Sequence, residues 1–213
     1  MTMKLNKPAV EAARDWWQRL HPNPVTGRGG DRAGRARLRR ASGPLEALLE
    51  PQTQALIETV RRASGKAWAL QVQYEDEETL LLRFGVLAIL LAETDVHFEE
   101  RQRGFAVLLG QTPDGLLTSE NKDRRWSVSR FGAMMRAWKE PDDFCRHVRR
   151  ALPVLKREPF DVTAFIRDVI GFDGAVQRKW IFDYYGRPQL AAGDGKAGAQ
   201  ESPAAGHDSP EEN

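Results

Sequence analysis

Residues 80–92 read LLLRFGVLAILLA, with Arg83 as the single charged residue among them. In a helix of 3.6 residues per turn, these apolar side chains would cover nearly every side, which is typical of a helix surrounded by other helices. The run is shorter than the roughly eighteen apolar residues that a membrane-spanning helix needs. We therefore expect it to form the central helix of a bundle, with no membrane as partner.

The segments on both sides of this run carry apolar residues on one helical face only, at spacings of three and four residues. The residues of these five faces are Val10, Ala13, Trp17 and Leu20; Leu56, Val60 and Ala63; Phe131, Met134, Met135 and Trp138; Val162, Phe165, Ile166 and Val169; and Val176, Trp180 and Tyr184. Asp161 precedes the fourth face, where a carboxylate caps a helix. The pattern predicts an all-α fold, a helical bundle of about eight to nine helices.

We expect this helical domain to span residues 1–187, either as one unit or as an N-terminal lobe over 1–110 and a C-terminal lobe over 122–187. Between the lobes, residues 110–121 contain the sequence Pro-Asp-Gly, which favours a loop. Residues 188–213 are small, polar and acidic, and we expect them to form a disordered tail. Residues 67–74 alternate apolar and polar side chains, so the pattern there fits either a helix or a strand.

The cysteine content and the N-terminal sequence indicate a cellular compartment. Cys145 is the single cysteine, so the chain cannot form an internal disulfide, which is typical of a reducing compartment. The first residues become acidic and polar too early for a secretory signal peptide. We therefore expect a cytoplasmic protein.

The formal net charge of +2 conceals an uneven distribution. Residues 191–213 carry one lysine and five acidic residues, a net −4, so residues 1–190 carry +6. Sixteen of the 31 basic residues in residues 1–190 lie in three clusters, over 27–41, 121–138 and 142–158. A surface that serves solubility alone mixes both signs of charge, whereas concentrated positive charge is typical of a protein that binds a polyanion.

The third cluster, DDFCRHVRRALPVLKRE over residues 142–158, shows the clearest separation of charge from apolar residues. On a helix, one side would carry Phe144, Val148, Ala151, Leu152 and Leu155, and the other side Arg146, Arg149, Arg150, Lys156 and Arg157. Pro153 predicts a kink. If the basic side is exposed, replacement of Arg146, Arg149 and Arg150 by Glu should weaken nucleic-acid binding and leave the fold unchanged.

In the first cluster, Asp31 is placed to cap a helix on which Arg32, Arg35 and Arg39 share one stripe, with Leu38 on the opposite side. In the second cluster, Trp126 follows two arginines and is a candidate platform for base stacking. Each cluster is also compatible with an ordinary solvated helix face. The preponderance of Arg over Lys favours planar contacts to phosphate oxygens.

Motifs of catalysis are not apparent. The sequence contains no phosphate-binding loop, no HExxH or CxxC metal motif and no GxSxG nucleophile motif. The adjacent Asp142 and Asp143 follow Pro141, where carboxylates favour the helix dipole. We therefore expect no catalytic residues, no metal and no cofactor.

Read in order, these segments resemble the CasB family, the small subunit of the type I-E CRISPR Cascade complex. The resemblance extends over about residues 10–186. Its segments are WWQRL (16–20), GDRAGRARLRRA (30–41), SVSRFGAMMRAW (127–138), PDDFCRHVRRALPVLK (141–156), FDVTAFIRDVIGF (160–172) and VQRKWIFDYYG (176–186). The order, the spacing and the RKW-x-x-DYY ending carry the resemblance, because no single segment is diagnostic.

The resemblance implies an all-helical, non-enzymatic subunit of an RNA-guided antiviral complex. Its implied partners are CRISPR RNA and target DNA in the R-loop and displaced strand, the large and backbone subunits, and a second copy of the chain. Matching positions in these segments are Arg39, Arg40, Arg130, Arg136, Arg149, Arg150, Arg178 and Lys179. Together with the clusters, the residues expected to bind nucleic acid are Arg32, Arg35, Arg39, Arg40, Arg125, Arg130, Arg136, Arg146, Arg149, Arg150, Arg157, Arg178 and Lys179.

Three further functions fit the sequence. Residues 160–186 could form a helix-turn-helix of a sequence-specific DNA-binding regulator, although Gly174, Ala175 and Val176 occupy the start of its second helix, where base-reading side chains are expected. The chain could also be a nuclease with an unfamiliar active site. A third possible function is a protein-interaction module whose arginines bind acidic protein surfaces.

Overall fold

The computed structural model describes residues 4–23, 26–68, 76–94, 103–116, 123–155 and 158–186. Within these ranges the predicted all-α fold is confirmed: no residue belongs to a β-strand, and β-structure is limited to isolated bridges such as that between Arg103 and Phe160. The predicted acidic tail over 188–213 and most of the ambiguous segment over 67–74 lie outside the described residues.

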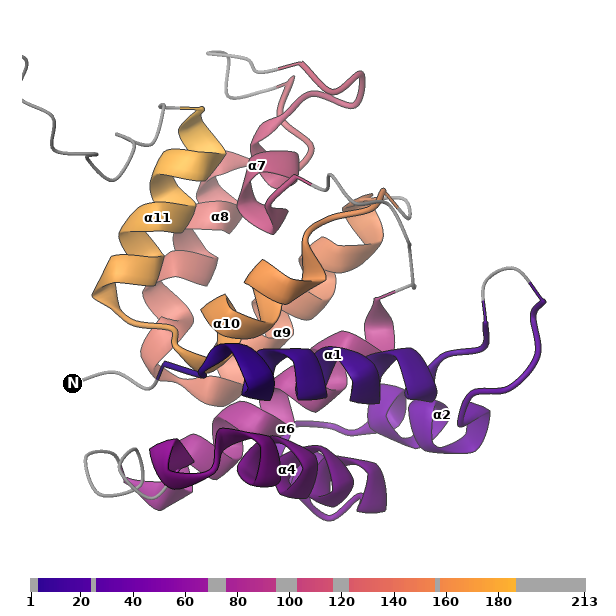
Figure 1. The fold of residues 1–213 in the computed structure, drawn as a ribbon. Helices are drawn as coiled ribbons and strands as arrows, with labels where there is room; N and C mark the ends of the chain where they lie inside the picture. The colour runs from indigo at the N-terminus through magenta and orange to yellow at the C-terminus, as the bar shows by residue number, and fades with distance from the viewer. Residues whose placement is uncertain are drawn as a thin grey trace, which may run out of the picture.

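The helices keep the labels of Figure 1. The α-helices are α1 (Lys7–Leu20), α2 (Arg32–Arg40), α3 (Pro44–Leu48), α4 (Pro51–Ser64), α6 (Glu77–Glu93), α7 (Phe105–Gly110), α8 (Val128–Arg136), α9 (Pro141–Ala151), α10 (Val162–Ile170) and α11 (Gly174–Tyr185), and the 3₁₀-helices are η2 (Ala137–Lys139) and η3 (Leu152–Leu155). Within the described residues no helix is long and apolar enough to cross a membrane.

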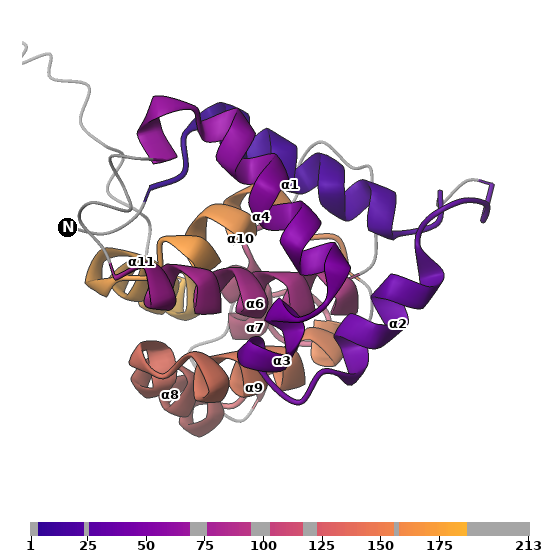
Figure 2. The same cartoon turned by 90° about the horizontal axis from the view of Figure 1, so that it is seen from below.

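Helix α6 is the centre of the fold, as predicted from its sequence. Its residues from Phe84 to Ala92 are all buried. Helices α2, α3, α4, α9 and α10 all pack against it, and Figures 1 and 2 show them around α6. Gly85 allows α3 to approach closely, because a Cβ atom at this position would overlap the carbonyl oxygen of Pro44.

A second close approach joins α7 to α11. A Cβ atom on Gly110 of α7 would overlap the carbonyl oxygen of Tyr184 on α11. Nearby, the ring of Phe105 packs against Phe165 and Trp180 at centroid distances of 5.1 and 5.2 Å. These contacts fix the position of α11 relative to the rest of the bundle.

Aspartates define where four of the described helices begin. At α6 the side chain of Asp76 accepts a hydrogen bond from the backbone N–H of Thr79. The side chains of Asp31, Asp161 and Asp173 accept hydrogen bonds from backbone N–H groups in the first turns of α2, α10 and α11. Such a bond satisfies one of the helix donors that have no partner within the helix. The caps predicted at Asp31 and Asp161 are thereby confirmed.

The apolar faces predicted from the sequence are the buried faces of these helices, with Ala63, Trp138 and Val176 only partly buried. At Pro153, α9 ends and continues as η3. A proline has no N–H to donate to the carbonyl four residues earlier, so the α-helical hydrogen-bond pattern cannot continue through it.

Candidate nucleic-acid interface

Helix α9 has an apolar side and a basic side. Phe144, Val148 and Ala151 are buried against the bundle, while Arg146 and Arg150 are exposed. Asp143 in the first turn forms an ion pair with Arg146, so one of these two positive charges is partly neutralised. Arg150 makes no hydrogen bond or ion pair in the described part of the chain. Acidic residues at the start and arginines at the end also complement the helix dipole.

Arg149 is different from its two neighbours, because its side chain is only 30% exposed and joins three segments. Its Nε atom donates to Glu93 at the end of α6 at 2.9 Å, and its Nη1 atom donates to the carbonyl of Ala41 at 3.0 Å. A third bond goes to the carbonyl of Arg39. The expectation that reversal of this charge would leave the fold unchanged is therefore wrong for Arg149.

Glu93 also pairs with Arg39 of α2, with 2.9 Å between Arg39 Nε and Glu93 Oε2. One carboxylate thus holds two guanidinium groups that are distant in sequence. The next residue, Arg40, is exposed and makes no hydrogen bond or ion pair in the described part of the chain. The end of α2 and the end of α9 therefore bring the first and third basic clusters together.

Helix α8 adds a further cation beside α9, against which it packs. Arg136 is exposed at the end of α8. Its effect on α9 is visible in the pKa of His147, which burial lowers first, followed by the positive charges of Arg146, Arg150 and Arg136. His147 therefore lies within the combined electrostatic field of these three arginines.

Six arginines from three helices thus form one basic surface, which we call the arginine face. Its members are Arg39, Arg40, Arg136, Arg146, Arg149 and Arg150. Figure 2 shows α8, α9 and α2 along the same side of the molecule. The carboxylates beside it include Glu93, Asp142, Asp143 and Glu46, so its six arginines outnumber them.

A cavity of about 430 Å³ opens between α9 and the loop after α2. It is lined by Ser42, Gly43, Asp142, Cys145, Arg146, Arg149 and Arg150. Its arginines suit a phosphate group or another oxyanion, whereas Ser42 already donates to the carboxylate of Glu46 through its N–H and its hydroxyl, and Asp142 adds a negative charge to the lining. Burial raises the pKa of Cys145 to about 12, so its thiol is not available as a thiolate nucleophile at neutral pH.

The family model for CRISPR-associated protein Cse2 matches residues 34–185, which include every arginine of the arginine face. The chain belongs to the Cse2 family. The family is that of the CasB small subunit of type I-E Cascade, so the resemblance found in the sequence is confirmed. Searches of the curated proteins and of the solved structures gave no match to the chain.

Membership assigns this Cse2-family chain the role of a small subunit in a CRISPR Cascade complex, which contains other subunits and nucleic acid. The Cse2 family is in general a structural, non-enzymatic component. Within the described residues, no group of three or more His, Cys, Asp or Glu side chains could hold a metal ion.

Two expected residues of the first cluster, Arg32 and Arg35, use their guanidinium groups in contacts within the fold. Arg32 donates to the carbonyl of Gly27 at 2.8 Å within its own loop. Arg35 donates through Nε to the carbonyl of Ala92 at 2.8 Å, and so helps to hold α2 against the end of α6. Both side chains therefore have structural roles in this Cse2-family chain.

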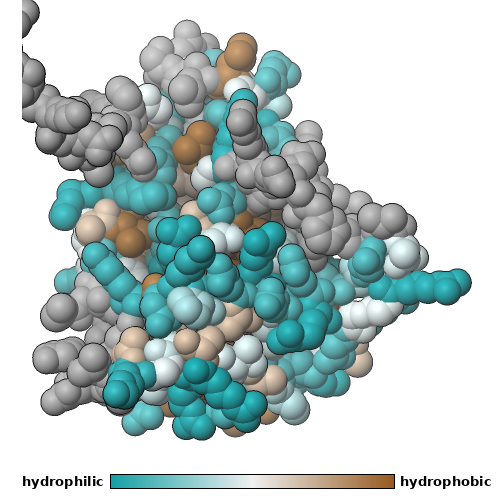
Figure 3. All heavy atoms as spheres, in the orientation of Figure 1, coloured by the Kyte–Doolittle hydropathy of each residue, from teal (hydrophilic) through white to brown (hydrophobic). Residues whose placement is uncertain are grey.

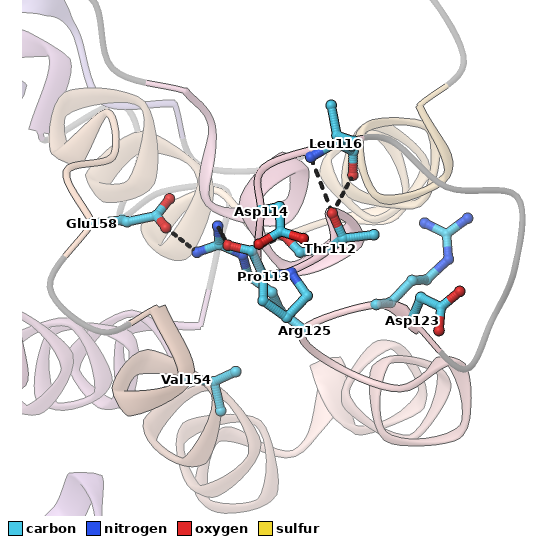
Figure 4. A pocket seen from close by; sticks show the side chains of 9 residues that line it. Thr112, Pro113, Asp114, Leu116, Asp123, Arg125, Val154 and Glu158 are labelled. Carbon is cyan, nitrogen blue, oxygen red and sulfur yellow. Dashed lines mark hydrogen bonds and ion pairs between the residues drawn. The ribbon is translucent and has the colours of Figure 1, made fainter.

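Arg125 of the second cluster is turned inward (Figure 4). Its side chain is only 5% exposed and pairs with Glu158. The guanidinium also donates to the carbonyls of Thr112 and Pro113 at 2.9 and 3.0 Å. Because its hydrogen-bonding atoms are occupied, Arg125 is not available to phosphate, and we omit it from the proposed site. Figure 4 shows these residues around a cavity of about 630 Å³.

Trp126 does not provide an open stacking surface, so that hypothesis is wrong. The residue is 4% exposed, and the guanidinium of Arg130 lies 5.3 Å from its ring centroid. Arg130 itself is exposed on α8. Its cation–π contact leaves its charge accessible from the solvent side.

The two expected residues of α11 differ. Lys179 Nζ lies 3.0 Å from Asp168 and 3.1 Å from Asp183, and these carboxylates raise its pKa against the effect of burial. Arg178 is exposed and makes no hydrogen bond or ion pair in the described part of the chain. Arg157 lies outside the described residues.

The sequence did not identify Glu93 as a determinant of the site. It lies 54 residues from Arg39 and 56 from Arg149, and nothing local marks it as their partner. A carboxylate directly after the long apolar run, at the last residue of α6, is the one signal that the sequence offers, because such a residue must lie where the core meets the surface.

Proposed function

We propose that the chain is the non-catalytic small subunit of a type I-E Cascade complex and that its arginine face binds the sugar–phosphate backbone of nucleic acid. The observation that supports this most strongly is the convergence of Arg136 and Arg150 around His147, since neither arginine has a carboxylate partner in the described residues. Concentrated like charge of this kind is relieved by a polyanionic partner.

In this proposal, CRISPR RNA reads the target by base pairing, and the subunit supplies contacts to the backbone only. Its partners would be CRISPR RNA and target DNA, the large subunit, the backbone subunits and a second copy of the chain. Formation of an R-loop is nearly balanced in free energy, so a few charge-assisted contacts to the displaced strand can decide its lifetime. The arginine face would therefore act by stabilising the open R-loop.

The first test removes charge from the arginine face and keeps the fold. The variant Arg136→Gln/Arg146→Gln/Arg150→Gln changes three exposed side chains and leaves Arg149 in place. Arg149 is held by contacts within the fold, so if the other five arginines of the face meet five phosphates of a single strand, a plot of log K against log salt has a slope of about −3.5. The variant should have a slope of about −1.5. Fluorescence anisotropy with a labelled single-stranded oligonucleotide over a salt series measures both slopes.

The control carries the same change of charge elsewhere. Arg14, Arg19 and Lys66 are exposed on α1 and after α4, two helices that pack against each other, and the variant replaces all three by Gln. It should bind as the unchanged chain does. Equal weakening in both variants would place the binding surface elsewhere. A slope of log K against log salt near zero for the natural sequence would contradict binding to the phosphate backbone.

A competition experiment distinguishes this proposal from a helix-turn-helix regulator. A backbone binder loses its labelled DNA to an excess of unrelated DNA of the same length, whereas a sequence-specific regulator retains it. Incubation with labelled RNA and DNA in the presence of magnesium or manganese tests for nuclease activity, and cleavage would contradict the proposal.

A further inference from the structure

Helix α11 presents a row of residues to solvent that the arginine clusters did not include. Ala175, Arg178, Phe182 and Tyr185 are all exposed. At 100° per residue they lie within one stripe of the helix, opposite the buried Trp180 and Tyr184. Phe182 is 43% exposed and Tyr185 is 42% exposed, although aromatic side chains of this size usually contribute to the core.

The surroundings of this aromatic stripe are positively charged. Arg178 lies one helical turn before Phe182. The guanidinium carbon of Arg124 is 5.2 Å from the ring centroid of Tyr185 and 4.8 Å from that of Tyr184. The ring of Tyr185 is held edge-on to Tyr184 at 5.1 Å, so its orientation is fixed by its neighbours.

The carboxylate of α11 between Phe182 and Tyr185 is paired within the protein. The carboxylate of Asp183 pairs with Lys179, and its side chain is 11% exposed. The exposed side of α11 therefore combines two aromatic rings with an arginine and offers little repulsion to a phosphate chain. This composition is typical of sites that bind single-stranded nucleic acid, where bases stack on aromatic rings beside cations.

The other exposed hydrophobic pair in the described residues has a different character. Leu45 and Leu49 of the α3 segment are 68% and 81% exposed, but both are aliphatic and present no aromatic surface to a base. Such a pair fits an apolar protein surface. The contrast favours nucleic acid over protein as the occupant of the α11 stripe.

Helix α11 packs beside α8, the helix that carries Arg136 of the arginine face. Gln177 Nε2 donates to the carbonyl of Met135 at 2.8 Å, which places the first half of α11 beside the end of α8. Arg136 of the arginine face is the residue after Met135. Figure 1 shows α11 alongside α8, and Tyr184 of α11 stacks on Phe131 of α8 at a centroid distance of 3.9 Å. The stripe lies on the opposite side of α11 from Tyr184 and therefore faces away from α8.

We propose that Phe182 and Tyr185 form a stacking platform for unpaired bases of single-stranded nucleic acid, with Arg178 binding an adjacent phosphate. This inference rests on the proposed function, because a strand bound by the subunit would supply the unpaired bases. It adds a preference for single strands, since bases within a duplex are already stacked and cannot reach the rings. The preference does not depend on sequence, because every base has an aromatic face.

The test compares a normal single-stranded oligonucleotide with an abasic one of equal length, which keeps every phosphate and lacks the bases. The natural sequence should bind the normal oligonucleotide about tenfold more tightly than the abasic one, toward the lower end of what base stacking gives. The variant Phe182→Ala/Tyr185→Ala should bind both equally. Its salt slope should not change, because no phosphate contact is removed.

Two control variants accompany this experiment. Phe182→Tyr/Tyr185→Phe keeps both rings and should retain the tenfold preference. Leu45→Ala/Leu49→Ala removes exposed apolar side chains elsewhere and should also retain it. All four changed residues are exposed, so the helical circular dichroism of each variant should match that of the natural sequence.

The outcomes separate the platform from the arginine face. If the natural sequence binds the abasic and the normal oligonucleotide equally, with a steep salt slope for both, the platform is absent and the backbone site stands. If the alanine variant keeps the tenfold preference, bases stack elsewhere and the inference is wrong. If neither oligonucleotide binds, the proposed function itself fails.

Discussion

His147 is the residue whose titration reports on the arginine face. Its pKa lies below the usual value of 6.5 because of burial and the positive charges of Arg146, Arg150 and Arg136. Phosphates bound at these arginines would offset their charge, so the pKa of His147 should rise on binding. Binding would then take up a proton, and the affinity should increase as the pH falls below about 6.5. NMR titration of the His147 ring, with and without a single-stranded oligonucleotide, measures both pKa values.

The free protein provides the control for this prediction. Replacement of Arg150 by Gln should raise the pKa of His147, and replacement of His147 by Gln should remove the pH dependence of the affinity in this range. For the free protein, a fall in pH has the opposite effect on the free energy of unfolding. A base with a lowered pKa binds protons less readily than in the unfolded chain, so His147 reduces the free energy of unfolding as the pH falls below 6.5. A pKa that does not respond to the oligonucleotide would show that phosphates do not approach these arginines.

At the scale of single residues, the sequence predicts well which side chains face outward. It predicts less well which arginines are free to bind phosphate. The basic side of α9 was correct, and so were the caps at Asp31 and Asp161. The inward turn of Arg125 toward Glu158 was not predicted, because the two residues lie in segments that only the folded chain brings together. Helical periodicity predicts the direction in which a side chain leaves the helix axis. It does not predict which residue of another segment will form an ion pair with that side chain.

Arg149 acts at the scale of elements, because it links the ends of α2, α6 and α9. Replacement by Met keeps the length of the side chain and removes its hydrogen bonds. The change leaves the largely buried carboxylate of Glu93 with one fewer cation, so we expect a loss of about 2 kcal/mol in the free energy of unfolding. Urea denaturation followed by circular dichroism at 222 nm measures this loss.

Arg150→Met is the matched control on the same helix. Arg150 is exposed, so the free energy of unfolding should change by less than about 0.5 kcal/mol. Equal losses in the two variants would mean that the contacts of Arg149 do not contribute to stability. If Arg150→Met weakens nucleic-acid binding and leaves the free energy of unfolding nearly unchanged, Arg150 contributes to binding and Arg149 to stability.

Long helices could be predicted from the sequence, whereas short ones could not. Helix α6 has 17 residues and a distinct composition, and α1 and α4 each have 14 residues with a clear apolar face. Helices α3 and α7 have five and six residues, too few for a periodic pattern to repeat. Their positions depend on Gly85 and Gly110, which allow close backbone contacts that only the tertiary structure reveals.

For the whole molecule, the apolar core must be stable enough to offset the repulsion among the surface arginines. Most buried side chains belong to a single cluster around α6 and the aromatic rings of α7, α10 and α11, while the arginine face lies at the ends of helices that surround it. Figure 3 shows hydrophilic side chains over most of the described surface in that view, with hydrophobic colour in separate spots. A bundle can carry excess positive charge on its rim because the apolar core supplies the stability that charge repulsion opposes.

The division into lobes over residues 1–110 and 122–187 stays a prediction, and the packing of the helices suggests how it should behave. Helix α6 packs against α9 and α10, and α1 packs against α10. Arg83 of α6 also donates to the carbonyl of Ile170 at 3.0 Å. Because these contacts join the two ranges through buried surface, we expect both to unfold together, as one cooperative unit.

Native-state hydrogen exchange in increasing urea tests this expectation in the full chain. The most protected amides of α6 and of α11 should converge on the same free energy of opening and the same dependence on urea. Phe105→Ala, which removes a ring packed between α10 and α11, should lower both values equally, since the loss of a buried aromatic ring destabilises the whole cooperative unit. If α11 opens at a distinctly lower free energy than α6, and Phe105→Ala affects α11 alone, the chain consists of two units that fold separately.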